Sequence, residues 1–293
     1  MGFLFLFIDG IGVAAAGEQN PFTLAEASVL APLGSDERGP VPFGGLLKPL
    51  DATLGVPGLP QSATGGTSLF TGVNAARLLG RHLQGMPHER LRALIREKGL
   101  LGRALAAGRS ACFANAYTPR FFDPNGRTRH SVTTVLTLSA GLPLMTLDDL
   151  RAGRALDRDF TNGILIERGY EVEALSPEEA GVRLARIAPE YDLLLYEYFE
   201  TDMAGHGRNM AVAVKEVKKL DRFLLSLLCS LDLERTSVIL TSDHGNLEDM
   251  SSHVHTRNPV PLFLWGAGGI ALAPSLSSIV HVTPALVQAL RSG

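Results

Sequence analysis

Acidic and histidine side chains follow or precede the apolar runs of this 293-residue chain, and these residue types bind divalent metal ions. They are Asp9, Glu200, Asp202, His206, Asp243, His244, His253 and His255. Carboxylates and imidazoles gathered at one place would repel one another and lose solvation unless cations joined them. A mixed Asp/His set suits Zn²⁺ or Mn²⁺, whereas a set of oxygen ligands alone would suit Mg²⁺ or Ca²⁺.

Each of these residues also has an ordinary interpretation. A single Asp after a strand commonly ends a turn, and Asp202 and His206, four residues apart, would form a surface pair on many helices. The hypothesis of a metal centre therefore depends on all of them meeting at one edge of the fold.

A second feature is the stretch of small and hydroxyl-bearing residues at 61–72, QSATGGTSLFTG. Small residues let the backbone approach a ligand closely, and a helix N-terminus after such a loop favours an anion. A glycine-rich turn with Ser/Thr caps is the ordinary alternative. A hydroxyl is a poor nucleophile at neutral pH, but coordination to a divalent cation lowers its pKa. The loop and the metal ligands would thus complete one another.

The apolar runs themselves are typical of buried strands, at residues 3–8, 111–116, 192–198, 236–241 and 260–265. Helical patterns lie between them, at residues 88–108, 178–188 and 210–231. Strands that alternate with helices predict an α/β fold, with a mainly parallel sheet and helices on both faces. Ligands bind at the carboxyl ends of the strands of such a sheet, where the acidic residues recur.

Two stretches interrupt this alternation. Residues 15–61 are rich in Gly and Pro and predict a long surface excursion after the first strand. Residues 118–165 contain turn-forming segments and predict a small cap over the site. No linker separates independent parts, so we expect a single α/β domain over residues 1–293, with 118–165 as a possible cap insertion.

The composition excludes several classes of protein. With 45% apolar and 19% charged residues the chain is not disordered, and a net charge of −3 argues against a nucleic-acid binder. Cys112 and Cys229 lie in apolar runs and are expected to be buried thiols in a reducing compartment. The first apolar run lacks a basic start and ends early at Asp9, unlike a signal peptide, and no run would span a membrane. These features predict a cytoplasmic protein.

In their order and rough spacing, the polar segments resemble the alkaline phosphatase superfamily, and within it the cofactor-independent phosphoglycerate mutases. The matching segments are residues 7–10, Ser62 with 69–72, 202–206, 242–246, 255–261 and 282–286. The Asp-His-Gly-Asn and His-Thr-x-Asn-Pro-Val-Pro segments are specific, and the resemblance extends from end to end of the chain. It implies an alkaline phosphatase-like fold and two divalent metal ions, Mn²⁺ or Zn²⁺.

The resemblance also implies roles for single residues. One ion would be bound by Asp9, Ser62, Asp243 and His244, and the other by Asp202, His206 and His255. Ser62, ten residues before Gly72, would attack phosphorus and form a phosphoserine, with Thr64 and Thr67 as the alternative nucleophiles. The Ser-x-Pro-x-Arg-like signature of sulfatases is absent, because Thr64 and Gly66 stand at its Pro and Arg positions.

The chain departs from the mutases in one respect. They carry a large second domain between the nucleophile and the Asp-x-x-x-His segment, whereas here residues 73–201 leave room only for a small cap. The resemblance therefore implies a two-metal phosphohydrolase acting on a small phosphate ester; the alternatives are a mutase-like phosphotransferase and a non-catalytic metal-binding scaffold. Candidate substrate contacts, each of a type common on protein surfaces, are Arg81, His82, Arg120, Arg127, Arg129 and Arg257.

Overall fold

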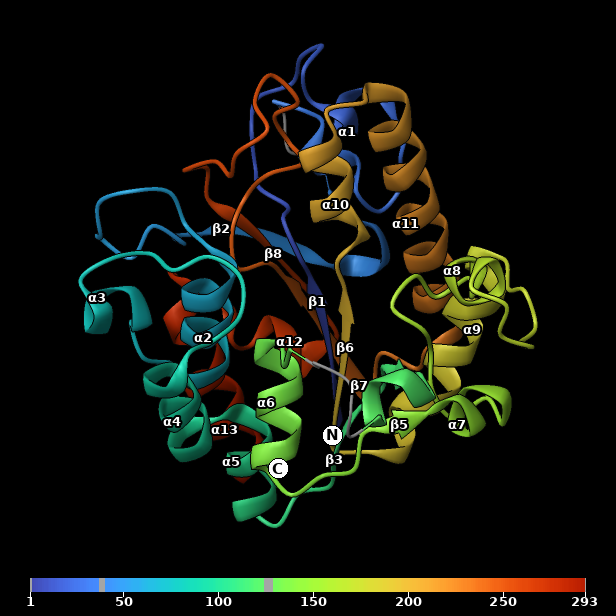
Figure 1. Cartoon of the computed structure of the whole chain (residues 1–293). Helices are drawn as coiled ribbons and strands as arrows, with labels where there is room; N and C mark the ends of the chain where they lie inside the picture. The colour runs from blue at the N-terminus through green and yellow to red at the C-terminus, as the bar shows by residue number, and fades with distance from the viewer. Residues whose placement is uncertain (1, 37–39, 124–128, 293) are drawn as a thin grey trace.

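A six-stranded sheet forms the centre of the computed structural model, which describes residues 2–36, 40–123 and 129–292 (Figure 1). The strands lie in the order β2-β8-β7-β1-β6-β3. Their bounds are β1 (Gly2–Ile8), β2 (Leu46–Leu50), β3 (Ala111–Phe113), β6 (Leu193–Tyr198), β7 (Thr236–Thr241) and β8 (Val260–Trp265). Strands β7, β1, β6 and β3 run in parallel, whereas β8 is antiparallel to both β7 and β2. The predicted α/β class is confirmed, with a mixed sheet.

Strand β2 lies within residues 15–61, where a surface excursion was expected. It pairs with β8 at the edge of the sheet, and Pro49 stands opposite Pro261 in the register. The sequence LLKPL is short and contains a proline, which is tolerated on an edge strand because an outward position needs no N–H donor. The predicted strand at 111–116 is also shorter than expected. It ends at Phe113, and β4 (Ala116–Tyr117) pairs instead with β5 (Met145–Thr146) in a separate sheet.

Helices cover both faces of the central sheet (Figure 1). Alternate residues of β1 point to opposite faces, as in any strand. Leu4, Leu6 and Ile8 pack in one cluster with α9 (Pro177–Ile187) and α11 (Met210–Ser230). Phe3, Phe5 and Phe7 pack in the other cluster, with α2 (Ser62–Thr71), α4 (Glu89–Lys98), α5 (Leu100–Ala106), α6 (Val132–Ser139) and α13 (Val282–Ser292).

Local signals define several helix ends. Ser176 and Glu179 form a capping box at the start of α9, where Pro177 is the first helical residue. The single helix predicted over 88–108 is two helices, because Gly99 between α4 and α5 is extended at φ −63° and ψ 140°. A Cβ on Gly99 would lie 2.5 Å from the carbonyl oxygen of Ile95 in α4, so the tight junction between the two helices favours glycine.

The stretch 118–165 contains α6, α7 (Leu147–Arg151), α8 (Gly163–Glu167) and the 3₁₀ helix η3 (Pro119–Phe122). Val132 and Leu136 of α6 belong to one sheet-covering cluster, and Leu156 and Phe160 belong to the other. Part of the stretch thus packs directly against the sheet, and its role as a cap stays a prediction.

The remaining elements are short and mostly connect the layers. They are α1 (Pro21–Leu24), α3 (Ala75–Leu79), α10 (Glu200–Gly207), α12 (Ala267–Ile270) and the 3₁₀ helices η1 (Ala31–Leu33), η2 (Pro42–Gly44), η4 (Ala188–Glu190), η5 (Ala273–Ser275) and η6 (Ile279–His281). Both cysteines are free: Cys112 is buried as expected, but Cys229 is exposed, so its predicted burial is wrong. Among the described helices, none combines the length and apolar character that a bilayer crossing requires.

Candidate metal centre and active site

The ends of three parallel strands bring the predicted metal ligands to one edge of the sheet. Asp9 follows β1, α10 with Asp202 and His206 follows β6, and Asp243 with His244 follows β7. Strand β8 runs the opposite way, so the segment that precedes it, with His255, starts from this same edge. The antiparallel direction of β8 explains why a residue before that strand joins residues that come after the others.

Asp9, Asp243 and His244 form the first group that could hold a metal ion. His244 Nε2 lies 3.3 Å from Asp9 Oδ1 and 3.7 Å from Asp243 Oδ1. Ser62 Oγ lies 3.0 Å from the same nitrogen. Ser62 is the first residue of α2, and the segment predicted as a loop is this helix.

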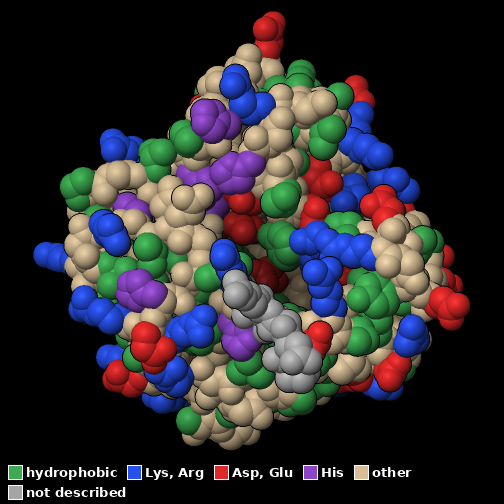
Figure 2. Space-filling view, viewed as in Figure 1, with side chains coloured by type: hydrophobic (Ala, Val, Ile, Leu, Met, Phe, Trp, Pro, Cys, Tyr) green, Lys and Arg blue, Asp and Glu red, His purple; other side chains and the backbone are tan. Residues whose placement is uncertain are grey.

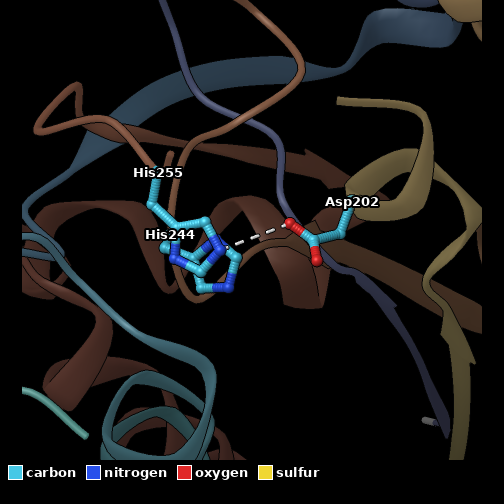
Figure 3. A group of neighbouring side chains, drawn as sticks. All are labelled: Asp202, His244 and His255. Carbon is cyan, nitrogen blue, oxygen red and sulfur yellow. Dashed lines mark ion pairs between the residues drawn. The ribbon is translucent and has the colours of Figure 1, made fainter. Parts of the chain in front are cut away.

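Asp202, His244 and His255 form the second group (Figure 3). His255 Nε2 lies 3.6 Å from Asp202 Oδ1 and 3.2 Å from His206 Nε2, and His206 Nε2 lies 3.3 Å from Asp202 Oδ2. The rings of His244 and His255 stack with their centroids 3.7 Å apart. His244 belongs to both groups, so the two groups adjoin each other.

Burial controls the charges at this site. It raises the pKa of Asp9, and the neighbouring Asp243 carboxylate raises it further. Burial also raises the pKa of Asp243, with the charge of Asp202 acting in the same direction. The pKa of His244 is lowered by burial and then by the nearby His255. In the absence of cations, burial therefore favours the protonated forms of Asp9 and Asp243 and the neutral form of His244.

Unpartnered oxygens test whether these residues fit a metal ion. Asp9 Oδ1 and both carboxylate oxygens of Asp243 are buried without a hydrogen-bond partner among the described residues. Leaving such acceptors unsatisfied is costly. A divalent cation would satisfy these acceptors, so the residues present fit a divalent metal centre.

The outer nitrogens of two histidines are fixed by backbone carbonyls. His255 Nδ1 lies 2.8 Å from the Pro60 carbonyl oxygen, and His206 Nδ1 lies 2.9 Å from that of His253. Each contact places the proton on Nδ1 and leaves Nε2 as a lone-pair donor, as in metal-ligating histidines.

The alternative nucleophiles face their own helix. Thr67 Oγ1 donates to the Ala63 carbonyl oxygen at 2.6 Å, and Thr64 Oγ1 donates to that of Gln61 at 3.2 Å. Both threonines are fully buried. Of the three hydroxyls considered, only that of Ser62 contacts a predicted metal ligand.

Three polar residues at the site had no predicted role. Glu197, near the end of β6, is half-buried, and desolvation of its carboxyl raises its pKa to about 7. It accepts a 2.6 Å hydrogen bond from Thr133 Oγ1. A lone acidic residue within an apolar strand was the signal that could have revealed it. Asn246 Nδ2 donates to Asp202 Oδ1 at 2.7 Å and so orients that carboxylate. Glu248, the third, is fully enclosed behind the same loops.

A cavity of about 420 Å³ adjoins this centre, with Asp9, Ser62 and Asp243 at one side. Figure 2 shows it as a hollow with acidic side chains at its floor and basic side chains along its rim. The arginines that line it are Arg129, Arg158 and Arg168.

Most of the predicted substrate contacts lie elsewhere. Arg81 is exposed, His82 Nε2 contacts the Val56 carbonyl oxygen at 3.3 Å, and Arg257 Nε donates to that of Gly58 at 3.1 Å. None of these three lines the cavity, whereas Arg120 lines a separate hollow beside it, together with Arg168. Arg127 is outside the described residues.

Comparisons with known proteins find similar sequences and similar folds. The family model of the Metalloenzyme superfamily matches residues 170–283. The 2,3-bisphosphoglycerate-independent phosphoglycerate mutase of Methylobacillus flagellatus is 29% identical over 110 residues, which cover 35% of this chain and 21% of the mutase. The enzyme of that name from Legionella pneumophila is 31% identical over 130 residues, covering 38% and 25%. The matches thus span a quarter or less of the length of these relatives.

Solved structures share the whole fold. The PH0037 protein of Pyrococcus horikoshii has a TM-score of 0.60 at 16% identity, covering 100% of this chain and 97% of that protein. The alkaline phosphatase of the Antarctic bacterium TAB5 has a TM-score of 0.56 at 13% identity, covering 100% and 98%. The family model and the mutase relatives, with this shared fold beside them, support an alkaline phosphatase-superfamily metalloenzyme.

Proposed function

We propose that this protein is a metal-dependent phosphohydrolase that cleaves a small phosphate ester through a phosphoserine on Ser62. The observation that supports it best is the position of Ser62 Oγ, 3.0 Å from His244 Nε2, at the side of the cavity formed by Asp9 and Asp243. A nucleophile, a metal-ligating set and a space for a small molecule thus adjoin one another.

The proposed metal ligands are Asp9, Asp243 and His244 with Ser62 for one ion, and Asp202, His206 and His255 for the other. Two divalent cations, Mn²⁺ or Zn²⁺, would neutralise the buried carboxylates, stabilise the phosphoryl oxygens and lower the pKa of the Ser62 hydroxyl.

The reaction itself needs two displacements at phosphorus. Ser62 Oγ forms a bond to phosphorus as the bond to the substrate alcohol breaks, and the alcohol leaves with a proton. Water then attacks the phosphoserine, which restores the Ser62 hydroxyl and releases inorganic phosphate. Ser62 begins α2, so the positive end of this ten-residue helix lies beside the transferring anionic group.

The second candidate is a phosphotransferase that returns the phosphoryl group to the substrate. It is favoured by the relatives, which are named as phosphoglycerate mutases. Against it, the cavity beside Ser62 opens at the molecular surface (Figure 2), so that water can reach a phosphoserine there. We therefore favour hydrolysis.

The test is a product assay on protein loaded with Mn²⁺ or Zn²⁺, with a panel of phosphomonoesters and phosphodiesters. We expect free phosphate as the main product. Ser62→Ala should keep the fold and most metal binding but lower phosphate release by orders of magnitude, because it removes the covalent route. The control Thr64→Ala, two residues away on the same helix, should have a much milder effect.

Two results would contradict this proposal in different ways. Phosphate trapped on Thr64 by acid quenching, or a fully active Ser62→Ala variant, would exclude Ser62 as the nucleophile. An isomeric phosphate ester as the only product would retain Ser62 and replace hydrolase by mutase.

A further inference from the structure

The cavity beside Ser62 is much larger than the reacting phosphoryl group requires. Its volume of about 420 Å³ is in the range of small-molecule binding sites. A phosphoryl group takes the space of only a few water molecules, each about 30 Å³ in the liquid. Because the phosphorus must lie next to Ser62 Oγ, the remaining space accommodates the alcohol part of the ester.

Aromatic rings form one wall of this remaining space. The centroids of Phe113 and Tyr117 are 6.4 Å apart, and those of Tyr117 and Phe121 are 4.5 Å apart. All three residues line the cavity. Tyr117 and Phe121 are only partly buried, so their rings offer apolar surface to a ligand. Such rings favour an aromatic partner in an offset-stacked or edge-to-face arrangement.

A buried acceptor without a partner lies at the same cavity. Asp157 lines it and is 5% exposed, and its Oδ2 has no hydrogen-bond partner among the described residues. The Tyr196 hydroxyl donates to the Asp157 carbonyl oxygen at 2.7 Å and holds this backbone in place. A buried acceptor of this kind is stabilised by a ligand that brings a hydrogen-bond donor.

Arginine side chains at this cavity offset the negative charge of its acidic residues. Asp157 and Glu197 would repel a phosphate dianion, whereas Arg129, Arg158 and Arg168 line the same cavity. Arg158 is engaged, with its guanidinium 4.7 Å from the centre of the Phe199 ring and 3.6 Å from Glu200 Oε1. Arg129 and Arg168 form no ion pair with any residue in the described part of the chain, which leaves them to attract an anionic substrate.

We propose that the substrate is a phosphomonoester of an aromatic alcohol whose ring carries a hydrogen-bond donor. The ring lies against Tyr117 and Phe121, and its donor binds the Asp157 carboxylate. This inference rests on the proposed phosphatase function and adds to it the class of alcohol.

The experiment compares four esters with the same reacting group, –CH₂CH₂–O–PO₃, on protein loaded with Mn²⁺. They are 2-cyclohexylethyl phosphate, 2-phenylethyl phosphate, and 2-(hydroxyphenyl)ethyl phosphate as its 3- and 4-isomers. We expect kcat/KM to rise about 2- to 10-fold from cyclohexyl to phenyl, the size of a typical aromatic pair contact. The better hydroxyphenyl isomer should gain about 10-fold more through its bond to a charged acceptor.

Variants assign these preferences to residues. Phe121→Ala should bring the ratio of phenyl to cyclohexyl kcat/KM close to one. The matched control is Phe122→Ala, the next residue of η3, which is 49% exposed and does not line the cavity and should keep the wild-type ratio. Asp157→Asn should remove most of the hydroxyl preference, since an amide oxygen is a weaker acceptor than a carboxylate.

Binding of the non-hydrolysable analogues 3-phenylpropylphosphonate and 3-cyclohexylpropylphosphonate, measured by calorimetry, separates this inference from the proposed function. Release of phosphate from all esters without aromatic preference would keep the phosphatase and overturn the aromatic site. Suppose that no ester is hydrolysed. If the phenyl analogue then binds several-fold more tightly than the cyclohexyl analogue, and Phe121→Ala removes this difference, the aromatic site is supported without the phosphatase activity. Equal binding of the two analogues overturns it.

Discussion

Glu248 is the buried carboxylate that joins the loops carrying the proposed metal ligands. Its Oε2 accepts from the backbone N–H groups of Gly12 at 2.7 Å and Asn246 at 2.8 Å. Its Oε1 accepts from Asn258 Nδ2 at 3.0 Å and from the Thr256 hydroxyl. All four partners are donors, so Glu248 must act as an acceptor through both oxygens.

Glu248→Gln should therefore destabilise the protein although its shape hardly changes. The amide NH₂ would face two donors in place of an acceptor, and losing hydrogen bonds to a buried charge costs about 1.5–3 kcal/mol each. We expect the free energy of unfolding in urea to fall by about 2–4 kcal/mol, with weaker divalent-metal uptake. The control is Glu234→Gln on the surface, and equal stability of the two variants would show that Glu248 does not hold these loops.

The buried carboxyls also predict how the stability of metal-free protein depends on pH. Burial raises the pKa of Asp9 and Asp243, and raises that of Glu197 to about 7. Above about pH 5.5 these groups are ionised in the unfolded chain but keep their protons in the folded one, so stability falls as the pH rises and levels off above the folded-state pKa values. Each carboxyl that stays protonated contributes up to about 1.4 kcal/mol per pH unit.

The measurement is urea unfolding of chelator-treated protein at pH 6.5 and pH 8. Burial lowers the pKa of His244 and His255, so both are neutral in the folded protein at these pH values. In the unfolded chain each is about half protonated at pH 6.5, which opposes the carboxyl effect by only about 0.4 kcal/mol per histidine. We expect lower stability at pH 8, a smaller slope in Asp243→Asn, and recovery when Mn²⁺ is added. A metal-free protein that becomes more stable between these pH values would contradict the raised pKa values.

At the scale of single elements, the sequence predicted those whose pattern is local. The alternation of apolar runs with amphipathic helices was sufficient for β1, β6, β7, α9 and α11. It could not predict the direction of β8 or the pairing of β2, because both depend on contacts between distant segments. The proposed metal ligands could be selected from the sequence because they stand beside strong strand signals. Phe121 and Asp157 were not, since residues 118–165 show no periodicity that indicates which side chains meet at the cavity. Glu197 had a local signal, a single acidic residue within the apolar strand β6, but nothing in the sequence showed what it contacts.

Two helix ends allow a matched prediction about glycine. Gly72 ends α2 and Gly80 ends α3, and both are left-handed, with φ of 75° and 74°. A Cβ on Gly72 would lie 2.6 Å from Pro284 Cγ at the start of α13, whereas a Cβ on Gly80 would meet open space. Alanine would therefore be strained in its backbone at both positions, but it would meet a packing conflict only at position 72.

Gly80→Ala should cost about 1–2 kcal/mol of unfolding free energy, the price of a left-handed alanine. Gly72→Ala should cost about 1–3 kcal/mol more, because α13 must also move away from α2. Chemical denaturation of both variants tests the difference. Equal losses would mean that α13 adjusts freely and that Gly72 is needed only for its backbone conformation.

At the scale of the whole molecule, the candidate metal centre connects segments that are far apart in the chain. Asp9 follows β1, Asp202 and His206 lie on α10, Asp243 and His244 follow β7, and His255 precedes β8. The unfolded chain cannot offer these ligands together, so cations that bind the folded state stabilise the entire fold. Metal binding and unfolding are therefore linked equilibria, and a change in metal affinity should appear as a change in stability.

Elemental analysis of protein loaded with Mn²⁺ or Zn²⁺ should approach two ions per chain, and loading should raise the unfolding midpoint. At a free ion concentration 100 times Kd the gain is about 2.7 kcal/mol for each site. His206→Ala should lose about one ion and part of this gain, because His206 Nε2 lies 3.3 Å from Asp202 and 3.2 Å from His255. The control His88→Ala, at an exposed histidine before α4, should behave like wild type. Wild-type protein that takes up no divalent ion and melts at the same temperature with and without metal would exclude the centre, whereas loss of both ions in His206→Ala would indicate that the two groups bind as one.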